Sequence, residues 1–562
     1  MQRLTGMDSA FVYMETPSMH MHVVGVFVFD TRSTPDFGYE RVRATVTERL
    51  HLLPPYRRRL VEVPLRLHHP VWVEDPDFDL DYHVRRVALP APGGRAELAE
   101  LVAEIAGRPL DMRRPLWESY VVEGLDNGYA ALVAKVHHAA IDGVSGAELA
   151  LSFLDLEADP PPVPEPVEPW VADQVPSEIE LLACSAALLV RQPAAALNVV
   201  RRTASALLAA RDRAKSAASG PAAVPFRAPR TVFNASITPH RRFAFTEVPL
   251  DLVKEVKSGL GVTVNDAVLA VCAGGLRRYL RSRSVIPPEP LVAMVPVSVR
   301  ADDEHGVPGN RLSAMLVPLA TNEADAVKRV HMVAEAAKAA KEQDHAIGPD
   351  LLTDWANLAA PSFAVRAARL ASSTRLFDRL RPMFNVVISN VPGPSFPLFG
   401  MGAPLVAMYP MGPIVEGVGL NITVMSYRGT MFFGLLACRE LVPRVDEIAT
   451  HIEGALAELV AEVRRVRNGA SAPHEGPKRS GRAAAVASAG TVAGAASVRH
   501  RSRSPGAPIA RERPARSLLG DLAPAAQSVP VSPQPGMLPQ VAGITVRTRY
   551  GSVGPLGPAP TL

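Results

Sequence analysis

The segment HHAAIDG, residues 137–143, is the most distinctive part of this chain. It follows an apolar run, YAALVAKV at residues 129–136, whose length is typical of a buried strand. The stretch GVSG, residues 143–146, leads into a helical pattern over residues 147–156. The sequence therefore places two histidines where a strand ends, with rigid support behind them and open space in front. Histidine suits proton transfer near neutral pH because its unperturbed pKa is about 6.5.

The two histidines are expected to face different surroundings. Adjacent residues of a strand point to opposite faces of the sheet, so one can face a substrate channel while the other packs against the fold. The same geometry argues against a metal site, since two ligands must converge on the ion. The cysteines also lack the paired spacing of zinc ligands; they are Cys184, Cys272 and Cys438. A nucleophilic serine in a Gly-x-Ser-x-Gly turn is excluded, because residues 143–147 read GVSGA.

Parts of this segment also have a structural interpretation. A histidine pair at a strand end is more often structural than catalytic, and Asp142-Gly143 alone is an ordinary turn signal. The complete string is far more specific, because it combines two histidines, an aspartate at fixed spacing and a glycine. It favours a histidine general base with Asp142 nearby.

The composition excludes several classes of protein. The 562 residues suffice for two or more domains, and 48% of them are hydrophobic. Eleven Lys/Arg and three Asp/Glu lie from Gly469 onward, a charge of +8, so residues 1–468 carry −4 of the net +4. The basic character belongs to this tail, and we expect no nucleic-acid partner. The unpaired cysteines favour a reducing compartment. We find no apolar core of a signal peptide. We also find no uncharged apolar run of the ~18 residues that a membrane span needs.

The chain is predicted to have four parts. Residues 1–157 alternate strand and helix signals. Residues 158–232 contain the Pro-rich linker PPPVPEPVEPW and an Ala/Leu-rich, mostly helical crossover. Residues 233–467 form a second alternating region. Residues 468–562 are rich in Ala, Gly, Pro, Ser and Arg, and we expect this tail to be disordered because it cannot bury enough apolar surface.

Periodicity and turn signals predict individual elements within the two alternating regions. The expected strands are residues 21–30, 243–249, 291–299, 384–389, 421–426 and 431–437, and the expected helices are residues 39–52, 96–105, 264–280 and 445–466. The last two strands are expected to form a hairpin across YRGT, residues 427–430.

Several motifs in this order resemble the bacterial wax ester synthase/diacylglycerol acyltransferase family, within the chloramphenicol acetyltransferase-like superfamily. The motifs are the opening LTGMDSAFVYM at residues 4–14 followed by ETP, PLW at 115–117, HHAAIDG at 137–143, NDAVLA at 265–270, MVPVS at 294–298 and SNVPGP at 389–394. The histidine string alone is shared across the superfamily. The resemblance covers roughly residues 1–467, so the tail departs from the pattern.

The resemblance implies a mixed α/β fold of two chloramphenicol acetyltransferase-like subdomains with a substrate tunnel between them. It implies transfer of a long-chain acyl group from acyl-CoA, as co-substrate and without a cofactor or metal, to diacylglycerol or a long-chain alcohol. His138 would be the general base that deprotonates the acceptor hydroxyl and then protonates the thiolate. His137 would be its supporting residue.

Asp142 has two possible roles. It could orient a histidine as in a triad, or it could pair with an arginine and hold the loop. The resemblance favours the second role, with Arg300 as a possible partner. Gly143 is expected to supply a backbone shape that a Cβ would block.

The motifs of the second region also have two interpretations. Asn265 and Asp266 are either an ordinary helix N-cap or residues near the tunnel that matter for activity. Residues 389–394 are expected to form a turn in the tunnel wall, where Ser389 and Asn390 could polarise the thioester oxygen. We treat these four residues as candidate substrate-binding residues beside Gly143.

The resemblance implies a cytoplasmic protein that associates peripherally with the inner face of the membrane or with lipid droplets. Residues 177–216 carry five arginines and are either a solvated surface or a site that docks on anionic lipid, and the basic tail would add to that attraction.

Three rival functions remain open at the level of the sequence. A glycerol-phosphate acyltransferase would share the His-x-x-x-x-Asp spacing, but its downstream basic elements are not found in order here. A stand-alone condensation enzyme would use carrier-protein thioesters. A lipid-binding homologue without activity is disfavoured by the intact His138.

Overall fold

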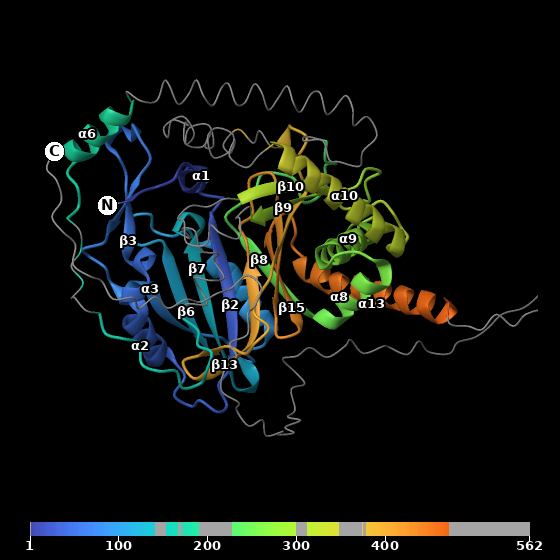
Figure 1. The fold of residues 1–562 in the computed structure, drawn as a ribbon, viewed down its shortest axis with the longest axis horizontal. Coiled ribbons are helices and arrows are strands. Elements are labelled where there is room, and N and C mark those ends of the chain that lie inside the picture. Colours follow the sequence, from blue (N-terminus) through green and yellow to red (C-terminus); the bar gives the residue numbers. More distant parts are fainter. Residues whose placement is uncertain are drawn as a thin grey trace, which may run out of the picture.

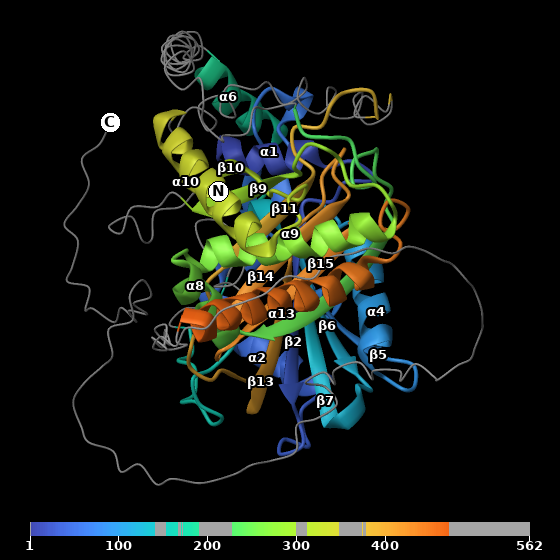
Figure 2. The same ribbon diagram turned by 90° about the vertical axis from the view of Figure 1, so that its right-hand side faces the viewer.

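The computed structural model describes residues 2–140, 153–166, 170, 172, 174–189, 227–298, 312–347, 374 and 378–470. It contains two six-stranded mixed sheets and one small three-stranded sheet, with helices packed around them (Figures 1 and 2). The mixed α/β class predicted from the sequence is confirmed. Much of the predicted crossover, and the predicted tail beyond Ala470, lie outside the described residues.

The first large sheet has the strand order β12-β13-β2-β7-β6-β5. Its strands β5 and β6 are parallel, and its other neighbouring pairs are antiparallel. The strands are β2 (His22–Asp30), β5 (Val84–Ala88), β6 (Trp117–Glu123), β7 (Tyr129–His137), β12 (Phe399–Gly400) and β13 (Ala403–Met411). The small sheet has the order β1-β4-β3 and consists of β1 (Gln2–Arg3), β4 (Val71–Glu74) and β3 (Arg58–Val61).

The helices of the first half are α1 (Gly6–Met14), α2 (Tyr39–Arg49), α3 (Leu80–His83) and α4 (Arg95–Gly107), followed after the linker by α6 (Glu178–Leu189). Short 3₁₀ turns are η1 (Leu50–Leu52), η2 (Pro54–Arg57), η3 (Pro64–Arg66), η4 (Asp126–Gly128) and η5 (His138–Ala140). The helices predicted over residues 39–52 and 96–105 are confirmed as α2, which continues into η1, and as α4.

The second large sheet has the strand order β10-β9-β11-β14-β15-β8. Its strand β11 is parallel to both β9 and β14, and the other neighbours are antiparallel. The strands are β8 (Arg241–Pro249), β9 (Val292–Ser298), β10 (Leu312–Pro318), β11 (Val386–Val391), β14 (Leu420–Tyr427) and β15 (Thr430–Cys438). The helices are α8 (Leu250–Leu260), α9 (Val264–Ser282), α10 (Ala326–Ile347) and α13 (Val445–Ala470).

The hairpin predicted in the second half is confirmed, with a tighter turn than expected. Strands β14 and β15 pair up to Tyr427 and Thr430, so only two residues connect them. Both have positive φ, 45° at Arg428 and 81° at Gly429, which is the backbone of a type I′ turn.

Helices α8, α9, α10 and α13 cover one face of the second sheet (Figure 1). Glycines allow α9 and α13 to approach closely. A Cβ on Gly274 would lie 2.7 Å from Ala455 Cβ, and one on Gly275 would lie 2.8 Å from Ile452 Cγ1. No single helix among the described residues has the length and apolarity of a membrane span; α8 and α9 reach the threshold only as a pair, across a 104° bend.

The two halves of the chain share one sheet. Strand β13 comes from the second half but pairs antiparallel with β2, from Leu405 opposite Phe29 to Met411 opposite Val24. The division at residue 232 therefore describes the order of the chain, whereas in space residues 399–411 complete the first half's sheet.

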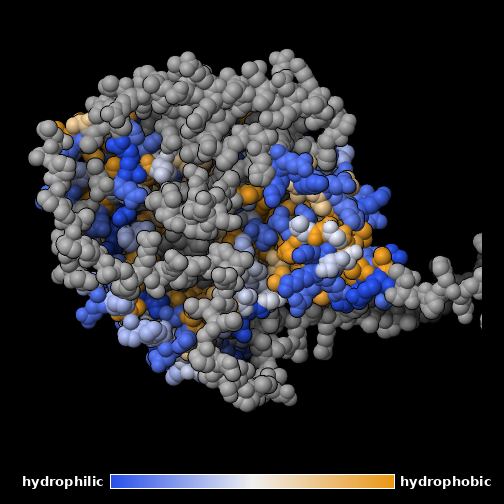
Figure 3. Space-filling model, in the orientation of Figure 1, coloured by the Kyte–Doolittle hydropathy of each residue, from blue (hydrophilic) through white to orange (hydrophobic). Residues whose placement is uncertain are grey.

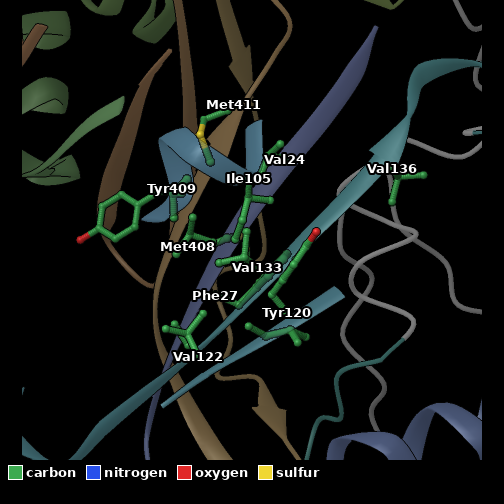
Figure 4. Packing of buried hydrophobic residues seen from close by; sticks show 14 of the residues in the cluster. Val24, Phe27, Ile105, Tyr120, Val122, Val133, Val136, Met408, Tyr409 and Met411 are labelled. Atoms are coloured by element: carbon green, nitrogen blue, oxygen red, sulfur yellow. The ribbon is translucent and has the colours of Figure 1, made fainter. Parts of the chain in front are cut away.

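A common hydrophobic core joins the halves. Figure 4 shows Met408 of β13 close to Val133 of β7 and Phe27 of β2, while the Tyr409 ring points away from them. The Tyr409 ring packs on Phe245 of β8, with 4.4 Å between ring centroids. Strand β8 adds Phe243 and Phe245 to this core, whereas its alternate residues face the helical layer. The second sheet thus buries both of its faces, which explains its nearly continuous hydrophobic strands.

A charged contact crosses the same boundary. The Arg95 guanidinium, at the start of α4, donates to both carboxylate oxygens of Glu247 in β8 at 3.1 Å, and also to the Phe245 carbonyl at 2.8 Å. The Tyr409 hydroxyl donates to Glu247 at 3.0 Å. The Glu247 side chain is only 8% exposed, so its carboxylate depends on these partners.

Replacing Arg95 by Ala should therefore destabilise the assembled fold. Removing one partner of a buried ion pair costs about 3–5 kcal/mol, and we expect roughly 2–4 kcal/mol here because Arg95 is 28% exposed. The matched control is Arg86→Ala, which breaks an exposed pair with Glu123 and should cost under about 1 kcal/mol. Melting temperatures of the two variants measure the difference; equal small shifts would show that Arg95 does not hold the halves together.

Candidate active site

Backbone hydrogen bonds fix both histidines at the end of β7. The His137 N–H donates to the Leu116 carbonyl at 2.9 Å, and the His138 N–H donates to the Met21 carbonyl at 2.8 Å. His137 lies directly opposite His22 of β2 in the sheet register. The two histidines are therefore held by neighbouring strands on both sides, as the sequence predicted for a strand end.

The side chain of His137 packs inside the fold and is fully buried. Its Nδ1 accepts a hydrogen bond from the Ala139 N–H at 3.1 Å, so this nitrogen carries no proton. The proton of the neutral ring is therefore on Nε2, which lies 3.2 Å from Glu15 Oε1. His137 thus clamps the turn η5, in which His138 is the first residue.

Glu15 links the ends of two strands. Its Oε1 accepts the Met21 N–H at 2.7 Å and faces His137 at the same time. Burial alone would raise the pKa of Glu15, but the His137 imidazole and the Met21 N–H lower it below its usual value. Sequence reasoning did not single out this residue; the only signal was its position in ETP, directly after the opening motif.

His138 is half-buried, and its ring stacks on Phe11 of α1 with 4.2 Å between ring centroids. Burial, and then the neighbouring His137, lower the pKa of His138 to about 4. The imidazole is therefore neutral at physiological pH and able to accept a proton.

More buried polar groups lie behind the two histidines. His20 and His22 stack with 5.6 Å between centroids, and the His22 Nε2 lies 3.0 Å from the Ala106 carbonyl oxygen. Lys135 of β7 is fully buried, and its Nζ lies 3.1 Å from Glu118 Oε2. Burial lowers the pKa of Lys135, and burial with the charge of Arg241 lowers that of His20 to about 4. This interior therefore disfavours any further positive charge.

The PLW motif packs beside the turn that carries the two histidines. The Leu116 carbonyl receives the His137 N–H, and the Trp117 indole N–H donates to the Tyr56 carbonyl at 2.8 Å. The Trp117 ring stacks on His83 with 4.5 Å between centroids. The motif thus supports β7 from the β6 side.

Asp142, Gly143 and Arg300 lie outside the described residues, so their predicted roles stay predictions.

The candidates of the second half lie at the start of α9 and the end of β11. The Asn390 amide Nδ2 donates to Asn265 Oδ1 at 3.4 Å, so the structure brings these two residues together. Ser389 lies in the β11 ladder opposite Thr423 of β14. Residues 389–391 therefore continue the strand instead of starting the predicted turn, because parallel pairing with β14 extends to Val391.

The cap of α9 differs in detail from the expectation. The N-cap residue is Thr263, whose hydroxyl accepts the Asp266 N–H at 3.1 Å, while the Asp266 carboxylate accepts the Thr263 N–H at 2.9 Å. These reciprocal hydrogen bonds form a capping box, so Asp266 stabilises the start of the helix. Asn265 is not the cap, and its side chain contacts Asn390 instead.

Among the described residues, no group of three or more His, Cys, Asp or Glu side chains is arranged to hold a metal ion.

Two mixed sheets that share a core, with a pair of histidines at the end of a central strand, are the arrangement that the resemblance implies for a two-halved acyltransferase. The comparisons with known proteins give the family. Residues 4–268 match the wax ester synthase/diacylglycerol acyltransferase catalytic domain, and residues 308–460 match the C-terminal domain of the same family. The chain belongs to this family of acyltransferases.

Individual relatives agree with that assignment. Two Mycobacterium tuberculosis proteins named as diacylglycerol O-acyltransferases are 39% and 40% identical over 463 and 468 residues, which covers 82% and 83% of this chain and 90% and 96% of theirs. The solved structure of a wax ester synthase/diacylglycerol acyltransferase from Marinobacter aquaeolei is 30% identical, with a TM-score of 0.58, and covers 82% of this chain and 100% of that one.

Replacing Glu15 by Gln should reduce turnover more than stability. The amide oxygen can still accept the Met21 N–H, but the charged contact to His137 is lost. A hydrogen bond to a charged group contributes about 1 kcal/mol more than a neutral one, so we expect roughly a fivefold lower kcat with little change in KM. Steady-state kinetics and a melting curve check this. An unchanged kcat, or a fall explained by unfolding, would contradict the positioning role.

The buried histidines should make stability depend on pH. The pKa values of His20 and His83 are lowered to about 4 by burial, against about 6.5 in the unfolded chain. Between these values the unfolded chain binds more protons, so stability falls as pH drops from about 6.5 toward 4, by up to about 3 kcal/mol per buried ring. The melting temperature should fall steeply below pH 6. In His20→Asn the slope should be shallower; a flat profile in the parent protein would refute the assignment.

Proposed function

We propose that this enzyme transfers a long-chain acyl group from acyl-CoA to the hydroxyl of diacylglycerol, of a long-chain alcohol, or of both. The single observation that carries the mechanism is the position of His138, a half-buried imidazole that follows β7, stacks on Phe11 and is held by the hydrogen bond of its backbone N–H to Met21. The names of the relatives support the choice of acceptors: the mycobacterial proteins are named for diacylglycerol and the Marinobacter protein also for wax ester.

The chemistry needs one base and no covalent enzyme intermediate. His138 takes the proton of the acceptor hydroxyl while the oxygen attacks the thioester carbonyl carbon. The tetrahedral intermediate then collapses, the carbon–sulfur bond breaks, and the imidazolium returns its proton to the coenzyme A thiolate. The products are an ester and free coenzyme A, and the imidazole is neutral again. We propose acyl-CoA as co-substrate and no further cofactor.

The other candidate residues act around this step. His137 and Glu15 hold the turn that carries His138, which supports a positioning role for both. We propose that Asp142 holds its loop by an ion pair and that Gly143 gives the loop its backbone shape. The Asn265–Asn390 pair, with Ser389, is proposed to line the acyl-CoA side of a tunnel between the halves, and Asp266 to keep the start of α9 in place.

We also propose that the enzyme works in the cytoplasm as a peripheral protein on the membrane or on lipid droplets. Both acceptors are lipids with long apolar chains, so they reside in such surfaces.

His138→Ala should lose about 10²- to 10⁴-fold in turnover while acyl-CoA binding and folding persist, since a general base contributes that much. His137→Ala should lose less and melt earlier, because it leaves Glu15 and the Ala139 N–H without their buried partner. The assay uses purified protein and labelled palmitoyl-CoA, offers diacylglycerol and hexadecanol together, and separates the products.

The same assay tests the alternatives. Turnover of His138→Ala within a few-fold of the parent would exclude this residue as the base. Activity with carrier-protein thioesters and amines, in place of acyl-CoA and hydroxyls, would favour a condensation enzyme. Binding of lipid without any turnover in the parent would favour a non-catalytic homologue.

A further inference from the structure

An exposed leucine stands at the tip of the loop between β3 and β4. Leu65 is 82% exposed, and both Leu65 and Arg66 have a left-handed backbone, with φ of 57° and 53°. Non-glycine residues rarely adopt this conformation, and a leucine gains nothing from it locally. The loop nevertheless holds it, with the Arg66 N–H bonded to the Val63 carbonyl at 2.9 Å. Leu65 thus adopts a backbone conformation that leucine disfavours, and its apolar side chain is exposed to solvent. This combination points to a functional constraint.

Helix α6 adds a second exposed apolar side chain at the same place. The helix contacts η3, and Leu181 anchors it by packing on Val71 and Val73 of the small sheet. Ile179 precedes Leu181 by two residues, so it points to the opposite face of the helix and is 79% exposed. Figure 3 shows apolar surface at the corner of the molecule where α6 lies in Figure 1. We call the four exposed side chains the apolar edge: Leu65, Leu67, Val175 and Ile179.

The charged side chains named beside the apolar edge are mostly acidic. The Arg66 guanidinium pairs with Glu62 at 3.1 Å, and the first turn of α6 carries the exposed acids Glu178 and Glu180. These described side chains provide no excess of positive charge to attract an anionic surface. The two most exposed side chains, Leu65 and Ile179, protrude from a loop tip and from a helix. Such points suit a fluid partner better than the fixed surface of another protein.

The apolar edge is physically linked to the candidate base. The loop behind Leu65 leads to His69, whose Nδ1 lies 2.8 Å from the Tyr13 hydroxyl of α1. The same helix carries Phe11, which stacks on His138. Helices α1 and α6 lie at the same end of the molecule in both ribbon views (Figures 1 and 2). Helix α1, which contacts His138, therefore lies at the same end of the protein as the apolar edge. A membrane that touches the apolar edge would lie at that end too.

We propose that the apolar edge inserts into the uncharged, zwitterionic phospholipid surface from which the acceptor lipid enters; this rests on the proposed function. Leu65 and Ile179 leave water and enter the acyl-chain region, while the ion pair of Glu62 with Arg66 stays at the headgroups. The association is driven by apolar burial, so it depends little on salt.

The test compares the full chain with a Leu65→Asp/Ile179→Asp double variant. Aspartate tolerates the left-handed backbone at residue 65, so folding should persist. The matched control is Val285→Asp, which changes an exposed valine next to Ser284, another residue with positive φ, in the other half of the chain. Binding is measured by flotation with phosphatidylcholine vesicles, with and without phosphatidylglycerol, at low and high salt.

We expect the double variant to bind phosphatidylcholine vesicles at least about tenfold more weakly than the parent, because each side chain contributes roughly a factor of ten or more on burial. The control should bind like the parent. All three proteins should turn over detergent-dispersed acceptor equally, so a failure of the proposed reaction would leave the vesicle result interpretable.

Three results would overturn the proposal. The double variant binds vesicles as tightly as the parent. The parent binds only in the presence of phosphatidylglycerol and dissociates at high salt, which would mean an electrostatic surface elsewhere. The parent is a dimer that the double variant breaks, which would make the apolar edge a contact between proteins.

Discussion

One carboxylate organises the candidate active site. Glu15 Oε1 accepts the Met21 N–H, and Met21 in turn accepts the His138 N–H through its carbonyl. The same oxygen faces the Nε2–H of His137, whose other nitrogen holds the Ala139 N–H. The backbone on both sides of His138 is therefore tied to one acidic group. Burial alone would raise the pKa of this carboxylate, but the His137 imidazole and the Met21 N–H lower it, so the group stays ionised.

Much of the fold follows from patterns that a single sequence displays. Residues 22–30 form a nearly continuous apolar run rich in β-branched residues, and the YRGT turn has the glycine that a tight hairpin needs. These fold predictions succeed because local periodicity and burial agree. The alternation of adjacent residues also predicts different surroundings for the two histidines, and His137 is fully buried whereas His138 is half-buried at the start of η5. Their catalytic roles stay predictions.

Other features depend on partners that lie far away in the sequence. Strand β13 carries Pro404 and Pro410, which usually argue against an internal strand, and it is tolerated here beside the two-residue β12 near the sheet edge. Strand β6 contains the buried Glu118, whose carboxylate accepts hydrogen bonds from Lys135 on the next strand, from Arg85 and from the Tyr120 hydroxyl. Glu15 follows a helix and shows no periodic signal at all. Each of these three features depends on a contact between residues that are too far apart in the sequence for a local pattern to reveal it.

The crossing of β13 into the first sheet also shapes how the protein is made. Leu405 pairs with Phe29, so this sheet joins residues about 380 positions apart. A ribosome adds roughly 5–20 residues per second, and the edge of β2 must therefore wait about 20–80 seconds for its partner. During that time an unpaired strand edge with Val26, Val28 and Phe29 is open to other chains. Early residues of this enzyme should consequently be chaperone clients, and a gene fragment that ends before residue 411 should yield aggregates instead of an isolated first half.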